Sequence, residues 1–191
     1  MSLILIKHAM PKIDPQHASA MWELGRDGIN GSKILGQKLK TQHVTRIITS
    51  HEKKAIQTGM IAAQVLGVPC VARDHLHEHD RRGVPYYDQE TFYKMVKQFF
   101  DVPDQLVFGH ETADAARQRF ETAVKAALTE FPEDRLAIVA HGTVITLFVG
   151  KYNQQIRLFE FWKQLDLPSI VILSQPYFKI QAVHSPIVTT S

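Results

Sequence analysis

The sequence predicts an α/β fold, a three-layer sandwich in which helices cover both faces of a mostly parallel central sheet. The first observation is a set of short apolar runs without polar alternation, as expected of strands that are buried on both faces. The second is that helical patterns separate these runs, because strands that alternate with helices usually pair in parallel. The 191 residues show no internal repeat or linker, so we expect a single domain over residues 1–191.

Five segments are expected to form strands. Four of them are the apolar runs at residues 3–6, 45–49, 136–140 and 169–173. The fifth is expected at residues 178–183, where it would pair with the fourth as a hairpin, because a Ser-Gln-Pro turn separates the two.

Three helices are expected between the strands, at residues 31–39, 51–66 and 112–131. The third has the clearest pattern, because its apolar residues return at the spacing of one helix face. In the second, Met60 and Leu66 are among the apolar residues expected to face the core.

The region from Arg73 to His110 does not follow this alternation of strands and helices. It holds seven of the fifteen Phe and Tyr residues of the chain and one further helical pattern near residues 91–100. We expect most of these aromatic side chains to pack in a small satellite core. Because such a segment can also cover a binding site, residues 73–110 are the expected cap and specificity segment.

Composition excludes several classes of protein. Apolar residues make up 45% and charged residues 21%, as in ordinary globular proteins. A net charge of +3 is too weak for a nucleic-acid groove, and the lysines and arginines are scattered. No run is long enough to cross a membrane, and the apolar start of the chain is too short for a signal peptide. We therefore expect a cytoplasmic protein without nucleic-acid or membrane partners.

Residues that suit phosphate chemistry follow three of the predicted strands. Lys7 and His8 end the first strand, Ser50 and Lys54 follow the second, and His141 follows the third. The carboxyl ends of neighbouring parallel strands lie at one edge of a sheet, which is where such folds place their sites. A single histidine would more often be structural, since the chain has ten. The placement of two histidines and two lysines after neighbouring strands favours one common site.

Five segments, in this order along the chain, resemble the motifs of the histidine phosphatase, or phosphoglycerate-mutase-like, superfamily. The small phosphatase-like branch is the most similar. The segments are Leu-Ile-Leu-Ile-Lys-His-Ala at residues 3–9, Thr-Ser-His-Glu-Lys-Lys-Ala-Ile-Gln-Thr at 49–58, Leu-His-Glu at 76–78, Glu111-Thr112 with Arg119, and Val-Ala-His-Gly-Thr-Val-Ile at 139–145.

The resemblance implies a phosphomonoester hydrolase that needs no metal and no cofactor. His8 would attack phosphorus and form a phosphohistidine, Glu78 would act as general acid and then as general base, and His141 would assist the transfer. Around the phosphoryl oxygens the resemblance implies Lys7, Lys54, Gly142 and Thr143. The expected partner is a small phosphorylated substrate or a phosphoprotein.

Two departures from the family pattern bear on activity. Lys7 and Lys54 stand where the family usually has arginine, which holds phosphate with a rigid two-pronged set of donors, whereas lysine is an undirected charge. Ala9 to Pro11 replace polar residues that contact phosphate in the mutases.

Several alternatives stay open. A phosphoglycerate-type mutase is the second function, although mutases usually end in a tail that closes the site and only one basic residue, His184, follows Lys179 here. A third is a weakly active relative that only binds a phosphorylated ligand. In an extended segment His75, His77 and His79 would share one face, so a divalent-metal site is also conceivable on ligand type. His79 followed by an aspartate resembles the acid element of longer, secreted phosphatases, but Glu78 remains the predicted acid.

Overall fold

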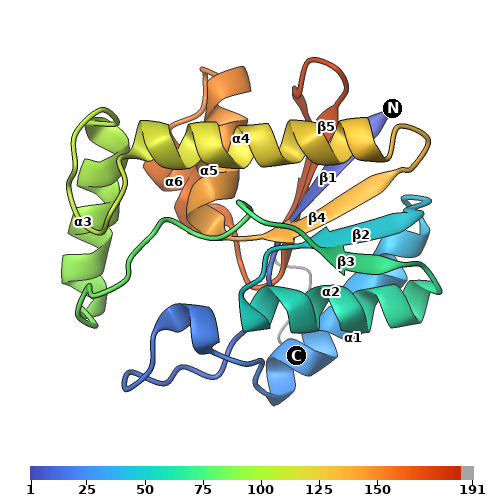
Figure 1. Cartoon of the computed structure of the whole chain (residues 1–191), viewed down its shortest axis with the longest axis horizontal. Coiled ribbons are helices and arrows are strands. Elements are labelled where there is room, and N and C mark those ends of the chain that lie inside the picture. The colour runs from blue at the N-terminus through green and yellow to red at the C-terminus, as the bar shows by residue number, and fades with distance from the viewer. Residues whose placement is uncertain (186–191) are drawn as a thin grey trace.

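The computed structural model describes residues 1–185, which build a six-stranded sheet with helices on both faces (Figure 1). The strand order is β3-β2-β4-β1-β5-β6, in which the first four of these strands are parallel and β5 and β6 close one edge as an antiparallel hairpin. The strands are β1 Ser2–Lys7, β2 Arg46–Thr49, β3 Cys70–Ala72, β4 Leu136–Ala140, β5 Ser169–Ser174 and β6 Ile180–His184.

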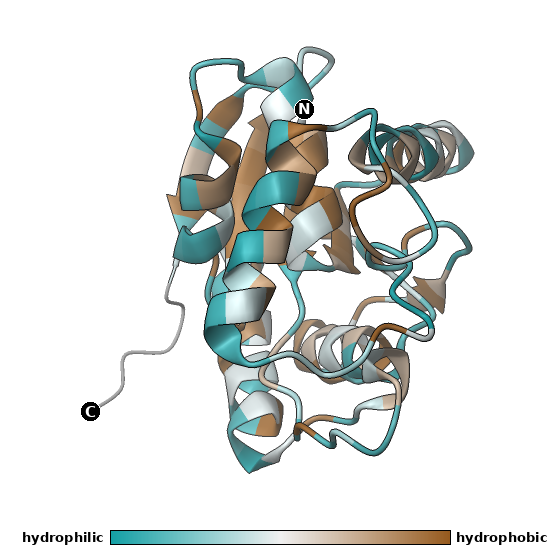
Figure 2. Ribbon diagram, turned by 90° about the vertical axis from the view of Figure 1, so that its left-hand side faces the viewer, coloured by the Kyte–Doolittle hydropathy of each residue, from teal (hydrophilic) through white to brown (hydrophobic). Residues whose placement is uncertain are grey.

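Two separate cores explain the unbroken apolar runs. Leu3 and Leu5 of β1 pack with the helices on one face, whereas Ile4 and Ile6 pack with those on the other. Residues 3–6 of this strand are therefore all buried, and no polar alternation is needed. The colouring of Figure 2 shows the same arrangement, with apolar strands between helices that turn polar surfaces outward. The predicted α/β class with a mostly parallel sheet is confirmed.

The helices divide between the two faces. On one face lie α1 and α2, and on the other lie α4 and α5, with the shorter α3 and α6 packed beside them (Figure 1). Their bounds are α1 Arg26–Lys40, α2 Lys53–Leu66, α3 Gln89–Asp101, α4 Ala113–Glu130, α5 Gly142–Tyr152 and α6 Leu158–Gln164. A short 3-10 turn, η1, spans Ser19–Met21.

Two details of the helices differ from the expectation. Helix α1 begins at Arg26, five residues before the predicted start, because its first turn is polar and carried no apolar signal. In α2, Met60 is 60% exposed, so its prediction as a core residue is wrong. The buried face of α2 consists of small residues, among them Ala55, Gly59 and Ala62, because the helix lies close against β2 and α1.

Residues 73–110 combine packing with exposed surface. Phe99, Phe100 and Phe108 are buried in the same core as Leu3 and Leu5 of the sheet, so the expected separate satellite core is wrong, and Tyr86 is exposed. Helix α3 carries the first two of these rings, and Asp88 caps its start by accepting a hydrogen bond from the Thr91 N–H. None of the helices within residues 1–185 combines the length and the apolar character needed to span a membrane.

Candidate active site

Strand register brings the predicted site residues to one edge of the sheet. Lys7 of β1 pairs with Ala140 of β4, and Thr49 of β2 pairs with Val139 of β4, so these three strands end almost level. The residues that follow them, including His8 and His141, therefore lie side by side.

His8 has the protonation state that a nucleophile needs. Its Nδ1 lies 2.8 Å from the carbonyl oxygen of Ala9, and because a carbonyl only accepts, Nδ1 must carry the proton. Burial, followed by the charges of His141 and Lys54, lowers the pKa of His8 well below its usual 6.5. The imidazole is thus neutral at pH 7, with an unprotonated Nε2.

His141 lies beside His8, with the two ring centroids 5.2 Å apart. Its Nε2 is 2.9 Å from the hydroxyl of Ser50 and 3.4 Å from Glu52 Oε1. Its Nδ1 is buried and has no hydrogen-bond partner within residues 1–185. Burial also lowers the pKa of His141 well below 6.5. An unpaired buried nitrogen is costly, which suits a site that receives a polar ligand.

Lys54, a predicted phosphate ligand, is buried and already paired. Its Nζ lies 2.5 Å from Glu52 Oε2 and 2.6 Å from the carbonyl oxygen of Ser19. Burial raises the pKa of Glu52, yet the charge and hydrogen bond of Lys54 outweigh this and leave the pKa below its usual value. The site therefore contains a carboxylate that sequence reasoning did not place there.

Lys7 is also engaged within the protein, but its partner is an uncharged backbone carbonyl. Its Nζ donates a hydrogen bond of 2.5 Å to the carbonyl oxygen of Leu165. Burial lowers the pKa of Lys7 to about 8. The stem of this side chain lies against Gly142, where an added Cβ would be 3.2 Å from Lys7 Cε and 3.3 Å from Trp162 Nε1. The glycine therefore leaves room for two side chains at the start of α5.

Glu78 lies at the amino end of α5. Its carboxylate accepts hydrogen bonds from the N–H groups of Thr143 (3.1 Å), Val144 (3.3 Å) and His79 (2.9 Å). Burial raises the pKa of Glu78, but the charges of Arg81 and His141 and the N–H donors outweigh it and lower the pKa to about 2. A general acid needs the opposite shift, so in this structure Glu78 is an anion that occupies an anion-binding helix end.

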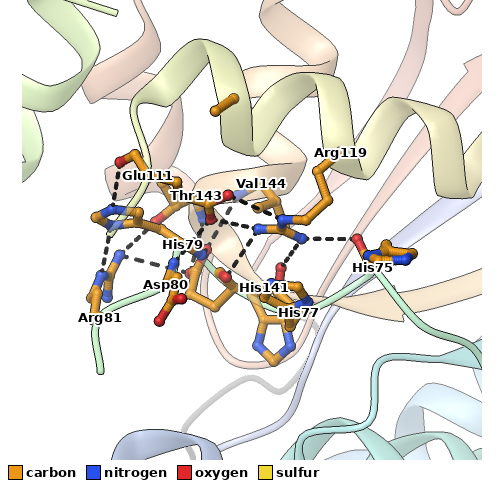
Figure 3. A network of polar contacts seen from close by, with 12 residues as sticks. His75, His77, His79, Asp80, Arg81, Glu111, Arg119, His141, Thr143 and Val144 are labelled. Carbon is orange, nitrogen blue, oxygen red and sulfur yellow. Dashed lines mark hydrogen bonds and ion pairs between the residues drawn. The ribbon is translucent and has the colours of Figure 1, made fainter. Parts of the chain in front are cut away.

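An ion pair fixes the loop that carries Glu78. Arg119 of α4 holds Glu111 through two hydrogen bonds and donates to the carbonyl oxygens of His75, His77 and Glu78 (Figure 3). Arg119 thus fixes the loop of Glu78, and within residues 1–185 it forms no hydrogen bond or ion pair with His8 or His141.

The three alternating histidines do not share one face. His75 is exposed and has a positive φ of 66°, so the segment is not extended there. His79 is buried between the rings of Phe99 and Phe108. Within the described residues, no three His, Cys, Asp or Glu side chains are grouped closely enough to hold a metal ion.

Arg81 is a site residue that sequence reasoning missed. Its Nη2 donates to the hydroxyl of Thr143 at 2.8 Å and lies 3.9 Å from Glu78 Oε2. Its guanidinium lies over the rings of Phe92 (4.9 Å) and Phe108 (5.5 Å). The available signal was an arginine three residues after the predicted acid, inside the expected cap segment.

Fold and site define an α/β protein that gathers two neutral histidines, two lysines and two carboxylates at the carboxyl edge of a parallel sheet. The family model described as histidine phosphatase superfamily, branch 1, matches residues 3–183. The chain belongs to this family, as the five motifs indicated.

Solved structures with the same fold include several phosphatases. The chain matches YhfR of Bacillus stearothermophilus with a TM-score of 0.73 at 19% identity, covering 95% of each chain. It matches a phosphoserine phosphatase mutant of Entamoeba histolytica, solved with phosphoserine, with a TM-score of 0.73 at 14% identity over 96% of each. A mycobacterial glucosyl-3-phosphoglycerate phosphatase gives a TM-score of 0.72 at 13% identity, covering 90% of this chain and 88% of that one. No curated protein sequence matches the chain significantly.

Proposed function

We propose that the protein is a phosphomonoester phosphatase that works through a phosphohistidine on His8. The observation that carries this proposal is the tautomer of His8. The hydrogen bond from Nδ1 to the Ala9 carbonyl leaves Nε2 with a free electron pair at an edge of the sheet that is rich in cationic groups. A neutral imidazole held in one orientation is the group that in-line attack on phosphorus requires.

In the first step, His8 Nε2 attacks phosphorus, the bond to the alcohol oxygen breaks, and that oxygen takes a proton. The phosphoryl oxygens then need positive charge and N–H donors. Lys54 and Lys7 supply charge, His141 supplies its unpaired nitrogen once protonated, and the start of α5 supplies the N–H of Thr143.

Glu78 is the proposed proton donor, and its low pKa sets a condition on the mechanism. A phosphate dianion beside Glu78 would repel the carboxylate and compete for the N–H of Thr143. Both effects raise the pKa of Glu78. We therefore infer that substrate binding brings a proton to Glu78, which passes it to the alcohol. In the second step the carboxylate takes a proton from water, which attacks phosphorus, and the bond to His8 breaks.

A second candidate function rests on a specific observation. Both lysines that replace arginine are engaged internally, Lys54 by Glu52 and Lys7 by the Leu165 carbonyl. A site whose cations are already paired would bind phosphate weakly and turn it over slowly. The second candidate is therefore a weakly active relative that binds a phosphorylated ligand.

One experiment separates these functions. The protein is mixed briefly with a labelled phosphomonoester and quenched in alkali, because a phosphohistidine is stable in base and labile in acid. We expect turnover and label on the peptide that contains His8, and neither in His8→Ala. The exposed His184 offers a control, since His184→Ala should behave as the parent. Label on His141, or full activity of His8→Ala, would overturn the proposed roles. Retention of label without turnover points to a mutase, and neither label nor turnover points to the binding protein.

A further inference from the structure

We propose that Arg81 binds a carboxylate carried by the leaving group, so that the substrates are phosphomonoesters of small hydroxy acids. The inference deepens the proposed function and rests on it.

Arg81 is a half-buried cation without a hydrogen-bonded anion within residues 1–185. Its side chain is 19% exposed, close to the 15% of Arg119, yet Arg119 has both oxygens of Glu111. Arg81 donates instead to the hydroxyl of Thr143 and to Nδ1 of His79. Burial lowers the pKa of His79 to about 4, so that ring is neutral at pH 7.

The nearest carboxylate does not fill this gap. Glu78 Oε2 lies 3.9 Å from Arg81 Nη2, beyond hydrogen-bond distance, and the oxygens of Glu78 are occupied by three backbone N–H groups. A buried guanidinium normally has an anion in its fork. Arg81 retains donor capacity for one more planar acceptor, and a carboxylate matches its two-pronged geometry.

Arg81 lies on the side of the leaving group. His141 lies beside His8, with ring centroids 5.2 Å apart, and Glu52 links Lys54 to His141, so these groups form the phosphoryl side of the site. Arg81 instead contacts Thr143 and Glu78, the proposed proton donor, and Figure 3 shows it at the opposite end of this polar network from His75. A group that Arg81 holds would therefore belong to the alcohol that Glu78 protonates.

Aromatic rings fix the guanidinium in place. The guanidinium carbon of Arg81 lies over the rings of Phe92, in α3, and Phe108. The ring of Phe92 meets that of Trp162, in α6, edge to face, with the ring centroids 6.0 Å apart. Phe92 and Trp162 are only partly buried. Trp162 also lies beside Gly142 at the start of α5. Arg81, Phe92 and Trp162 thus form one wall, which suits a small leaving group that is apolar apart from its acid.

The test compares acids with neutral amides of the same shape. The substrates are two pairs, phosphoglycolate with its amide and 4-carboxyphenyl phosphate with 4-carbamoylphenyl phosphate. We expect kcat/KM to favour the acid in at least one pair. Arg81→Met should lower kcat/KM for that acid by about 10- to 100-fold more than for its amide, the effect of a hydrogen bond to a charged group. A change common to both esters would report the loss of the charge beside Glu78. Arg82→Met is the matched control, because Arg82 is exposed and pairs with Asp80.

Two results would overturn the inference. One is that the parent shows no preference for either acid. The other is that Arg81→Met lowers acid and amide equally, which would place Arg81 on the phosphoryl group or in a structural role. If Arg81→Met fails to fold, Arg81→Lys replaces it, because lysine keeps the charge but lacks the two-pronged guanidinium. Competitive inhibition of the parent by 4-hydroxybenzoate and by 4-hydroxybenzamide also compares an acid with its amide. If no ester is turned over, the proposed function fails, and calorimetric binding of the four esters still decides the role of Arg81.

Discussion

At the scale of single residues, the site is distinguished by carboxylates placed among its cations. Glu52 holds Lys54, and Glu78 occupies the N–H groups at the start of α5. Lys54 and the Thr143 N–H are the groups that the proposed mechanism assigns to phosphate. The two carboxylates keep a buried cluster of charges paired, because unpaired buried charges are strongly destabilising. They also oppose the binding of an anion.

Removal of the Glu52 charge should strengthen anion binding. In Glu52→Gln the carbonyl oxygen can still accept from the Glu78 N–H, but Lys54 no longer faces a carboxylate. We expect the inhibition constant of vanadate or inorganic phosphate to fall on the order of tenfold, the value of one charge-assisted hydrogen bond. The control is Glu23→Gln, which removes an exposed partner of Lys53. Weaker inhibition in Glu52→Gln would show that Glu52 is needed to organise the site.

At the scale of elements, the amino end of α5 is the centre of the site. His141 precedes the helix, Gly142 admits the stem of Lys7, and Thr143 joins Glu78 to Arg81. This helix contributes its unpaired N–H groups and the positive end of its dipole. A second element, α4, acts from a distance, because Arg119 ties the loop of Glu78 to it.

Loss of Arg119 should affect only the step that needs the acid. In Arg119→Met the carbonyl oxygens of His75, His77 and Glu78 lose their donor, and Glu78 loses its fixed position. We expect kcat for alkyl phosphates to fall by about 10- to 100-fold, as for a misplaced general acid. Aryl phosphates with good leaving groups should change far less.

The measurement is the dependence of kcat on the pKa of the leaving group. Arg117→Met is the control on the same helix, since Arg117 pairs with Asp114 and Glu121 rather than with the loop. An equal loss for good and poor leaving groups would mean that Arg119 supports the fold and has no particular link to proton donation.

At the scale of the whole molecule, burying neutral histidines makes stability depend on pH. The pKa values of His8 and His141 lie well below 6.5 in the folded protein, and that of His79 is about 4. Unfolding returns the three imidazoles to water, where they take up protons below pH 6.5. Because the unfolded state then binds more protons, the free energy of unfolding must decrease as pH falls.

We expect the free energy of unfolding to drop between pH 6.5 and pH 5, by at most about 1.4 kcal/mol per pH unit for each of the three groups. Urea titrations at several pH values would measure this slope. His141→Gln should reduce it by about one proton, whereas His184→Gln, at an exposed position, should not. A stability that stays constant from pH 6.5 to pH 5 would contradict the neutral state of the buried histidines.

Residue patterns along the chain were sufficient to predict most of the sheet and the edge at which the candidate site lies. Strands buried on both faces need unbroken apolar runs, and polar residues that follow such runs must lie where parallel strands end. This reasoning located β1, β4 and His8 correctly in the fold, and the family follows from the same segments. It missed β3, which has only three residues, too few for a pattern.

The electrostatics of the site, by contrast, depend on tertiary packing. Lys54 and Glu52 pair where the start of α2 is buried, and the low pKa of Glu78 and the contact of Arg81 with Thr143 depend on how their loop folds back onto α5. A pKa reflects burial and the distances to neighbouring charges, and in the loops that carry Glu78 and Arg81 neither quantity follows a period along the chain. Most residues of the candidate site could therefore be predicted from the sequence, whereas their charges and hydrogen-bond partners depend on packing.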